Sequence, residues 1–109
     1  MSKKETIPPE IKEVVEKIVE DFNKNVLKND YRYYQIRYEG RFLYPDLSDN
    51  GRLGLICRLD YTGKIDKWKF AIFEYSSERY NSHEWFFPGA NFVDGAVQGT
   101  MTAGLEAYQ

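Results

Sequence analysis

The chain has 109 residues, a formal net charge of −2 at pH 7, and an aromatic content of 17% supplied by nine Tyr, seven Phe and two Trp. A chain of this length buries one hydrophobic core, so residues 1–109 are predicted to form a single globular domain with residues 1–7 flexible, and a multidomain enzyme is excluded. The near-neutral charge supplies no overall field that attracts polyanions, which disfavours bulk binding of nucleic acid or of an anionic membrane surface.

An amphipathic helix is predicted from Pro8 to Lys28. The two prolines at positions 8 and 9 suit a first helical turn, where the missing N–H groups would have no partner. Apolar residues follow at the i, i+3, i+4 and i+7 spacing of one helical face: Ile11, Val14, Val15, Ile18, Val19, Phe22, Val26 and Leu27. The opposite face carries charges of both signs and is predicted to be solvated.

From Tyr31 to Ser77 the apolar period changes to two, which is typical of strands with one side on a core. Four strands are predicted, at 31–39, 41–44, 52–61 and 67–75. The segments that join them are a turn at Glu39-Gly40, a connection over 45–51 and a turn at 62–64.

The predicted strands assign side chains to two faces. In the third strand one side holds Leu53, Leu55, Cys57, Leu59 and Tyr61, and the other holds Arg52, Gly54, Ile56, Arg58 and Asp60. The fourth strand is apolar on both sides, with Trp68, Phe70 and Ile72 opposite Ala71, Phe73 and Tyr75. This two-sided hydrophobicity predicts partial cover of both sheet faces.

Residues 76–91 are predicted to form a long aromatic loop, and residues 92–108 a second helix. Gly95, Gly99 and Gly104 each lower helix propensity by about 1 kcal/mol relative to Ala, so close packing has to offset that loss. Packing on the chain's own sheet is favoured over packing on a partner helix. The predicted fold is α+β: an N-terminal amphipathic helix, an antiparallel meander of about four strands, an aromatic loop, and a C-terminal small-residue helix packed on the sheet.

No motif indicates a cofactor, a metal centre or a catalytic residue. Segment 46–51 has oxygen ligands at alternate positions, as a calcium loop does, but its twelfth position is Cys57 instead of Glu, so a hairpin connection is the better interpretation. His83 lies beside Glu84, a pair that can act as a general base. Because the single cysteine is expected to be buried and inert, a loop histidine without a chemical task is favoured.

The run Trp85-Phe86-Phe87-Pro88-Gly89 is too apolar to be exposed cheaply. Two interpretations stay open. The favoured one is a plug of the domain's own core. In the alternative, Trp85 and Phe86 anchor an interface with a partner.

The sheet side away from the first helix combines aromatic and basic residues. The candidate binding residues there are Tyr33, Arg37, Arg58, Lys69, Phe73 and Tyr75. Rings that stack bases and cations that contact phosphates are what a single-stranded nucleic acid needs. The simpler interpretation, which is favoured, is that long basic side chains lie across exposed rings.

The leading functional hypothesis is a non-catalytic protein-interaction module, with self-association among its forms. Single-stranded nucleic-acid binding through the Arg/Tyr face is the alternative, and a small-ligand binder or enzyme with a pocket between the sheet and the C-terminal helix is the third. A cytoplasmic location is expected, because Cys57 cannot close an intrachain disulfide and the polar N-terminus lacks the apolar core of a secretory signal. No membrane partner is expected, because no apolar run is long enough to span a bilayer.

Overall fold

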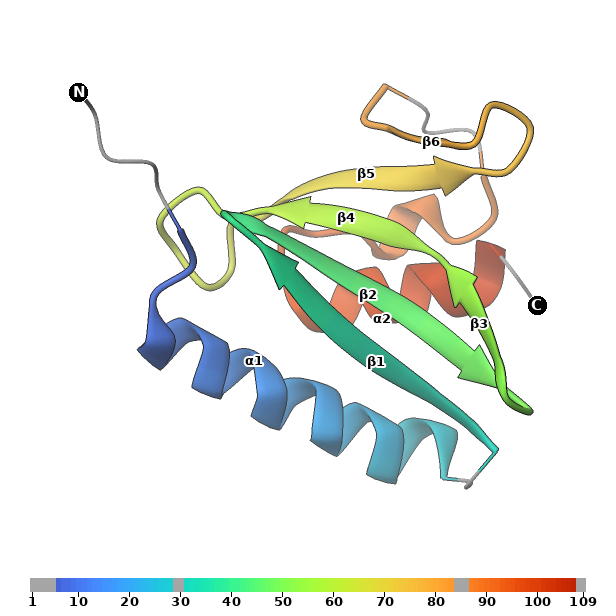
Figure 1. Ribbon diagram of the computed structural model, residues 1–109, viewed down its shortest axis with the longest axis horizontal. Coiled ribbons are helices and arrows are strands. Elements are labelled where there is room, and N and C mark those ends of the chain that lie inside the picture. The colour runs from blue at the N-terminus through green and yellow to red at the C-terminus, as the bar shows by residue number, and fades with distance from the viewer. Residues whose placement is uncertain (1–5, 29–30, 84–86, 108–109) are drawn as a thin grey trace.

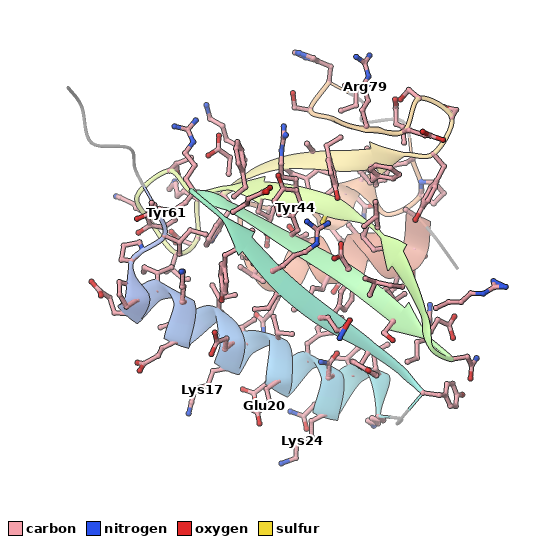
Figure 2. All side chains as sticks on the ribbon, viewed as in Figure 1. Lys17, Glu20, Lys24, Tyr44, Tyr61 and Arg79 are labelled. Carbon is pink, nitrogen blue, oxygen red and sulfur yellow. The ribbon has the colours of Figure 1, made fainter. Side chains whose placement is uncertain are left out.

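The N-terminal helix forms where the apolar spacing predicts it. The computed structural model describes residues 6–28, 31–83 and 87–107 of the chain. Helix α1 spans Pro9–Phe22 and continues as a π-helical turn, η1, over Asn23–Leu27. The polar side of this helix is solvated as predicted, and Figure 2 shows the labelled side chains Lys17, Glu20 and Lys24 pointing away from the sheet.

A six-stranded antiparallel sheet follows the helix and confirms the predicted α+β class. The strands are β1 (Arg32–Glu39), β2 (Phe42–Asp49), β3 (Arg52–Leu55), β4 (Cys57–Asp60), β5 (Lys69–Glu74) and β6 (Arg79–Asn81). Their order across the sheet is β1-β2-β4-β5-β6, and β3 pairs with β2 beyond the end of β4. Six strands replace the predicted four because the third predicted strand is divided and the predicted aromatic loop contains β6.

Strand β2 is longer than predicted, and the connection expected over 45–51 was wrong except for the tight turn at Asn50-Gly51. Pro45 is tolerated inside a strand with neighbours on both sides because of its position. On the side of β2 away from β1, Leu43 pairs with β4 and Leu47 pairs with β3. Pro45 lies between the segments of β2 that pair with β4 and with β3. Its missing N–H therefore removes no hydrogen bond from either pairing.

The predicted third strand is broken at Ile56 by a β-bulge. The pairing of β2 changes from Asp46↔Leu55 to Leu43↔Leu59, a register offset by one extra residue. Because of the extra residue, Leu53 and Leu55 lie on the opposite face of the sheet from Cys57 and Leu59, whereas unbroken alternation would put all four on one face. The prediction that Leu53 and Leu55 face the core was wrong: Leu53 is 55% exposed, whereas Ile56 is buried.

Both helices lie on one side of the sheet. One hydrophobic cluster joins Val15, Val19 and Phe22 of α1, Val97 and Met101 of α2 (Val97–Ala107), and the inward residues of the strands. Figure 1 shows α2 behind the sheet and no helix across the near face. The expectation that helices cover part of both faces is thus wrong.

The C-terminal helix begins five residues later than predicted, after the 3₁₀ turn η2 (Ala90–Phe92). The Asp94 side chain accepts a hydrogen bond from the backbone N–H of Ala96 at 3.1 Å, just before the helix. Gly104 packs directly on the sheet, because a Cβ at this position would lie 2.6 Å from Ile56 Cγ2 and would also overlap the Tyr34 hydroxyl. This contact confirms the preferred prediction that the small residues of α2 pack on the chain's own sheet.

Part of the predicted aromatic loop packs on the core. Phe87 is half-buried and stacks on Phe70, with ring centroids 5.8 Å apart and planes inclined by 28°. This agrees with the interpretation of the aromatic run as a plug, as far as Phe87 is concerned. Trp85 and Phe86 lie outside the described residues.

The free edge of β1 is partly closed by a side chain. Asn23, at the first position of η1, donates from Nδ2 to the Tyr34 carbonyl at 3.0 Å and accepts the Tyr34 N–H at 2.8 Å on Oδ1. One amide thus replaces the neighbouring strand that an edge residue lacks. Such blocking of an edge opposes pairing with another chain, so it argues against strand addition along β1.

We expect Asn23→Ala to destabilise the protein by about 1–3 kcal/mol, because two partly buried backbone groups of Tyr34 lose their hydrogen bonds. Urea unfolding measures the change. The matched control is Asn25→Ala, on the same turn but exposed, for which about 0.5 kcal/mol or less is expected. Equal stabilities of the two variants would show that the Asn23 bonds contribute nothing.

Candidate functional site

The side of the sheet without helices carries most of the predicted binding residues. Alternation along the paired strands places these side chains on it: Tyr33, Gln35, Arg37, Glu39, Phe42, Tyr44, Asp46, Ser48, Leu53, Leu55, Arg58, Asp60, Lys69, Ala71, Phe73, Tyr75 and Tyr80. We call this surface the open face. Figure 2 views the molecule with Tyr44 labelled over the strands of this face.

A continuous layer of rings fills the middle of the open face. The ring of Tyr80 lies 5.3 Å from that of Tyr44 and 4.9 Å from that of Phe73, centroid to centroid. Tyr44 and Tyr80 belong to β2 and β6, which are separated by β4 and β5 and would be roughly 14 Å apart in a flat sheet. The sheet therefore curls toward the open face, and this curvature buries Tyr44 and Phe73 without a helix.

Arg37 is held on this layer by a buried carboxylate. Its Nε donates to Asp46 Oδ2 at 2.8 Å, its guanidinium carbon lies 4.4 Å from the centroid of the Tyr44 ring, and a terminal nitrogen donates to the Tyr80 hydroxyl at 3.3 Å. The Asp46 side chain is only 3% exposed, whereas that of Arg37 is 46% exposed. The pair thus orients a half-exposed guanidinium from beneath.

The electrostatics of Asp46 depend on this partner. Burial raises the pKa of the Asp46 carboxyl above its ordinary value, while the hydrogen bond and positive charge of Arg37 lower it. For Arg37, partial burial lowers the pKa, but the hydrogen bonds and charges of Asp46 and Tyr80 together outweigh it and raise the pKa overall. Each ion thus favours the charged form of the other.

Arg58 lies beside the same rings but has no carboxylate partner among the described residues. Its guanidinium is 4.7 Å from the Phe42 centroid and 5.6 Å from the Tyr80 centroid. Arg41, at the turn before β2, is 2.7 Å from Asp60, so the carboxylate two residues along β4 from Arg58 is already paired with another guanidinium. Within the described part of the chain, Arg58 is thus a half-buried cation that lies against rings and pairs with no carboxylate.

The end of the open face near the β2–β3 turn is apolar and exposed. The strand register aligns Tyr33, Ser48 and Leu53 across β1, β2 and β3. Tyr33 is 36% exposed, Leu53 55% and Tyr75 52%. A shallow groove of about 210 Å³ lies at the edge of β3 beside Leu53 and Tyr75, but the rest of its lining belongs to the helix side of the strands and includes two charged residues: Leu47, Asp49, Arg52, Gly54 and Ile56.

The charges of the open face nearly balance. Its strands hold three basic and three acidic described residues: Arg37, Arg58, Lys69, Glu39, Asp46 and Asp60. Arg41, paired with Asp60 from the adjoining turn, adds one positive charge. A phosphate backbone is bound chiefly through a large excess of positive charge, which the described residues of this face do not supply. The rings nearest the arginines also already carry a guanidinium on them, as the simpler interpretation predicts.

The structure brings together six of the eight predicted binding residues: Tyr33, Arg37, Arg58, Lys69, Phe73 and Tyr75. The other two, Trp85 and Phe86, lie outside the described residues. Sequence reasoning missed Tyr44, Asp46 and Tyr80. The outward period of β2 is the signal for both Tyr44 and Asp46. The predicted connection over 45–51 hides it for Asp46, whereas Tyr44 lies inside the predicted strand 41–44 and could have been assigned to this face.

The candidates for chemistry remain apart. His83 is exposed in the turn after β6, where its backbone N–H donates to Asn81 Oδ1 at 2.9 Å, and Glu84 lies outside the described residues. Cys57 is wholly buried on the helix side, and burial raises the pKa of its thiol well above the ordinary value. Its thiolate is therefore not available as a nucleophile.

A hollow of about 480 Å³ lies between the sheet and the C-terminal helix, where the third hypothesis places a ligand pocket. Arg32, Asp49, Leu105 and Glu106 line it. The arginine of that hypothesis is present, whereas none of the described lining residues is a tyrosine. Within the described part of the chain, His, Cys, Asp and Glu residues form no group of three able to hold a metal ion.

No helix among the described residues is long and apolar enough to cross a membrane. No family model matches the chain, and neither characterised proteins nor solved structures show a significant similarity to it.

Proposed function

We propose that this chain is a non-catalytic protein-binding domain and that its open face is the binding surface. The observation that carries the proposal is an uncovered sheet face, with little net charge, in which arginines lie on a packed layer of Tyr and Phe rings. Tyr and Arg are enriched at the cores of protein interfaces, whereas Lys and Glu are depleted there.

The pre-organised state of the face supports this role. The Arg37 guanidinium is fixed by Asp46 and Tyr80, so its immobilisation on binding costs little further conformational entropy. The exposed apolar end supplies surface that gains free energy when a partner removes it from water. Three of the seven large hydrophobic residues that are exposed in the described chain belong to this one face: Tyr33, Leu53 and Tyr75.

The test compares two doubly substituted proteins. Tyr33→Ser with Leu53→Ser removes two exposed apolar side chains from the open face, and Val14→Ser with Val26→Ser removes two from α1 and η1, where Val14 is 44% and Val26 55% exposed. Proteins captured from the source cells are quantified for each, and each captured protein is then purified and titrated against all forms. We expect the open-face variant to weaken binding at least about tenfold and the helix variant to leave it unchanged.

Equal binding by the two variants, or a captured protein that crosslinks to α1, would overturn the proposal. A parallel titration with labelled single-stranded RNA and DNA at low salt tests the nucleic-acid alternative. Because the charges of the face nearly balance, no saturable binding is expected at micromolar concentrations. Saturable binding that is lost in Arg58→Ala would favour that alternative instead.

A further inference from the structure

We infer that one partner of the open face is a second copy of this chain, bound about a twofold axis so that Arg58 of each copy pairs with the partner's Glu39. This inference rests on the proposed binding role of the open face and adds the identity of a partner. Its starting point is the contrast between Arg58 and the other two arginines at this face.

Arg37 and Arg41 each have a carboxylate within the chain, Asp46 at 2.8 Å and Asp60 at 2.7 Å. Arg58 has none among the described residues, although it is half-buried and lies between the rings of Phe42 and Tyr80. A hydrogen bond from a guanidinium to a carboxylate is about twice as strong as one between neutral groups, so a carboxylate supplied across an interface would stabilise Arg58. The site at Arg58 is therefore incomplete within one copy.

The chain carries a suitable carboxylate on the same face. Glu39 is exposed at the end of β1, opposite Phe42 in the register of β1 and β2, and has no basic partner among the described residues. Glu39 lies on β1 and Arg58 on β4, on either side of β2. The two groups thus flank Phe42, over which the Arg58 guanidinium is placed.

This placement suits an isologous contact. In a twofold dimer, if residue i of one copy contacts residue j of the other, then j also contacts i. An axis near Phe42 therefore forms two equivalent pairs, Arg58 with the partner's Glu39 and Glu39 with the partner's Arg58. Because the charges of the open face are of both signs and nearly balance, two copies can approach without the repulsion that a face of single sign would create.

The test is a pair of charge reversals, measured by sedimentation equilibrium up to about 1 mM protein, since a contact centred on one end of a sheet is expected to be weak. We expect wild type to show a monomer–dimer equilibrium. Arg58→Glu alone and Glu39→Arg alone should each raise the dimer dissociation constant at least about tenfold, because each homodimer then holds two like-charge pairs. An equimolar mixture of the two variants should dimerise again, because both opposite-charge pairs are restored in the heterodimer.

Matched controls reverse charges that point away from the sheet: Lys17→Glu and Glu20→Arg should leave the dissociation constant unchanged. Arg58→Gln removes the positive charge without introducing repulsion, so it should weaken dimerisation less than Arg58→Glu does. If Arg58→Glu does not fold, Arg58→Gln replaces it in the test. Glu39→Arg is at an exposed position, so its loss of dimerisation is measured on a folded protein.

A wild-type protein that stays monomeric, or a mixture of the two variants that fails to form a heterodimer, would overturn this inference. If wild type stays monomeric but Tyr33→Ser with Leu53→Ser still weakens the binding of a captured protein, the open face binds a different protein and the proposed function stands. If wild type stays monomeric and the open-face and helix variants bind captured proteins equally, the binding role of the open face is refuted as well.

Discussion

Substituting Gly104 with Ala is expected to destabilise the protein by about 2–3 kcal/mol, although Ala is the better helix former. Helix propensity alone would favour Ala by about 1 kcal/mol. The added Cβ, however, would lie 2.6 Å from Ile56 Cγ2 and would overlap the Tyr34 hydroxyl. Overpacking of a tight core costs about 1–3 kcal/mol, and displacement of a buried hydroxyl adds the loss of its hydrogen bond.

That hydrogen bond runs from the Tyr34 hydroxyl to the Met101 carbonyl of α2 at 2.8 Å. Burial raises the pKa of the Tyr34 phenol well above its ordinary value, and the nearby Cys57 acts in the same direction, so the hydroxyl keeps the proton that it donates. The link between β1 and α2 therefore has two components, a hydrogen bond and the close approach that Gly104 permits.

Urea unfolding of a double-mutant cycle separates these components. Tyr34→Phe removes the hydroxyl and should cost about 1–2 kcal/mol by itself. In the Tyr34→Phe background one of the two overlapping groups is absent, so Gly104→Ala should cost at least about 1 kcal/mol less than in wild type. If the two costs are simply additive, the hydroxyl is not what makes Ala unfavourable at this position.

The same contacts explain why some elements could be predicted from the sequence. Helix α1 could be predicted because its buried residues, such as Val15 and Val19, recur at the helical spacing. The two faces of β5 could be predicted because its residues, such as the buried Phe70, follow a period of two. Gly104 could be assigned to close packing because a glycine inside a helix has a cost that only a contact offsets. These signals are local, so one sequence is enough to detect them.

The bulge at Ile56 could not be predicted in the same way. Alternating apolar residues run through positions 53–59 without a break, and the extra residue is detectable only against the partner strand β2. The error placed Leu53 in the core, although it is among the most exposed apolar residues of the open face. The face on which a side chain lies beyond a bulge depends on how its strand pairs with the neighbouring strand. This pairing joins residues far apart in the sequence, so it cannot be read from the strand's own residues.

The candidate site was predicted in composition but not in architecture. Arg37, Arg58, Phe73 and Tyr75 were expected on one side of the sheet, and they lie there. The burial of Asp46 beneath Arg37 could not be expected, because the predicted strand 41–44 ends before Pro45. The curl that brings Tyr80 of β6 over β2 likewise depends on the whole sheet.

Removing Arg37 should make the stability of the protein depend more strongly on pH through Asp46. The Asp46 carboxyl is buried, so in Arg37→Ala it loses its positive partner and its folded-state pKa rises further. A carboxyl whose folded-state pKa is raised favours folding only while it is protonated. Its contribution is complete below the unfolded pKa of about 4 and is lost as the pH rises through the folded pKa.

The difference in unfolding free energy between wild type and Arg37→Ala should therefore be small at pH 4 and grow toward pH 7. At pH 4 it contains mainly the lost contact of Arg37 with the Tyr44 ring, about 0.5–1 kcal/mol at a half-exposed site. At pH 7 it should reach about 2–3 kcal/mol, below the 3–5 kcal/mol of a fully buried broken pair because Arg37 is half-exposed. Urea unfolding at both pH values measures it.

The control is the same substitution in an Asp46→Asn background, where no carboxyl titrates beneath Arg37. There the cost of Arg37→Ala should be equal at pH 4 and pH 7. A cost that still rises with pH would assign the effect to another group, and a flat cost in the Asp46 protein would show that the pair does not stabilise the open face. With the predicted result, Asp46 is the group that fixes the guanidinium Arg37 presents to a partner.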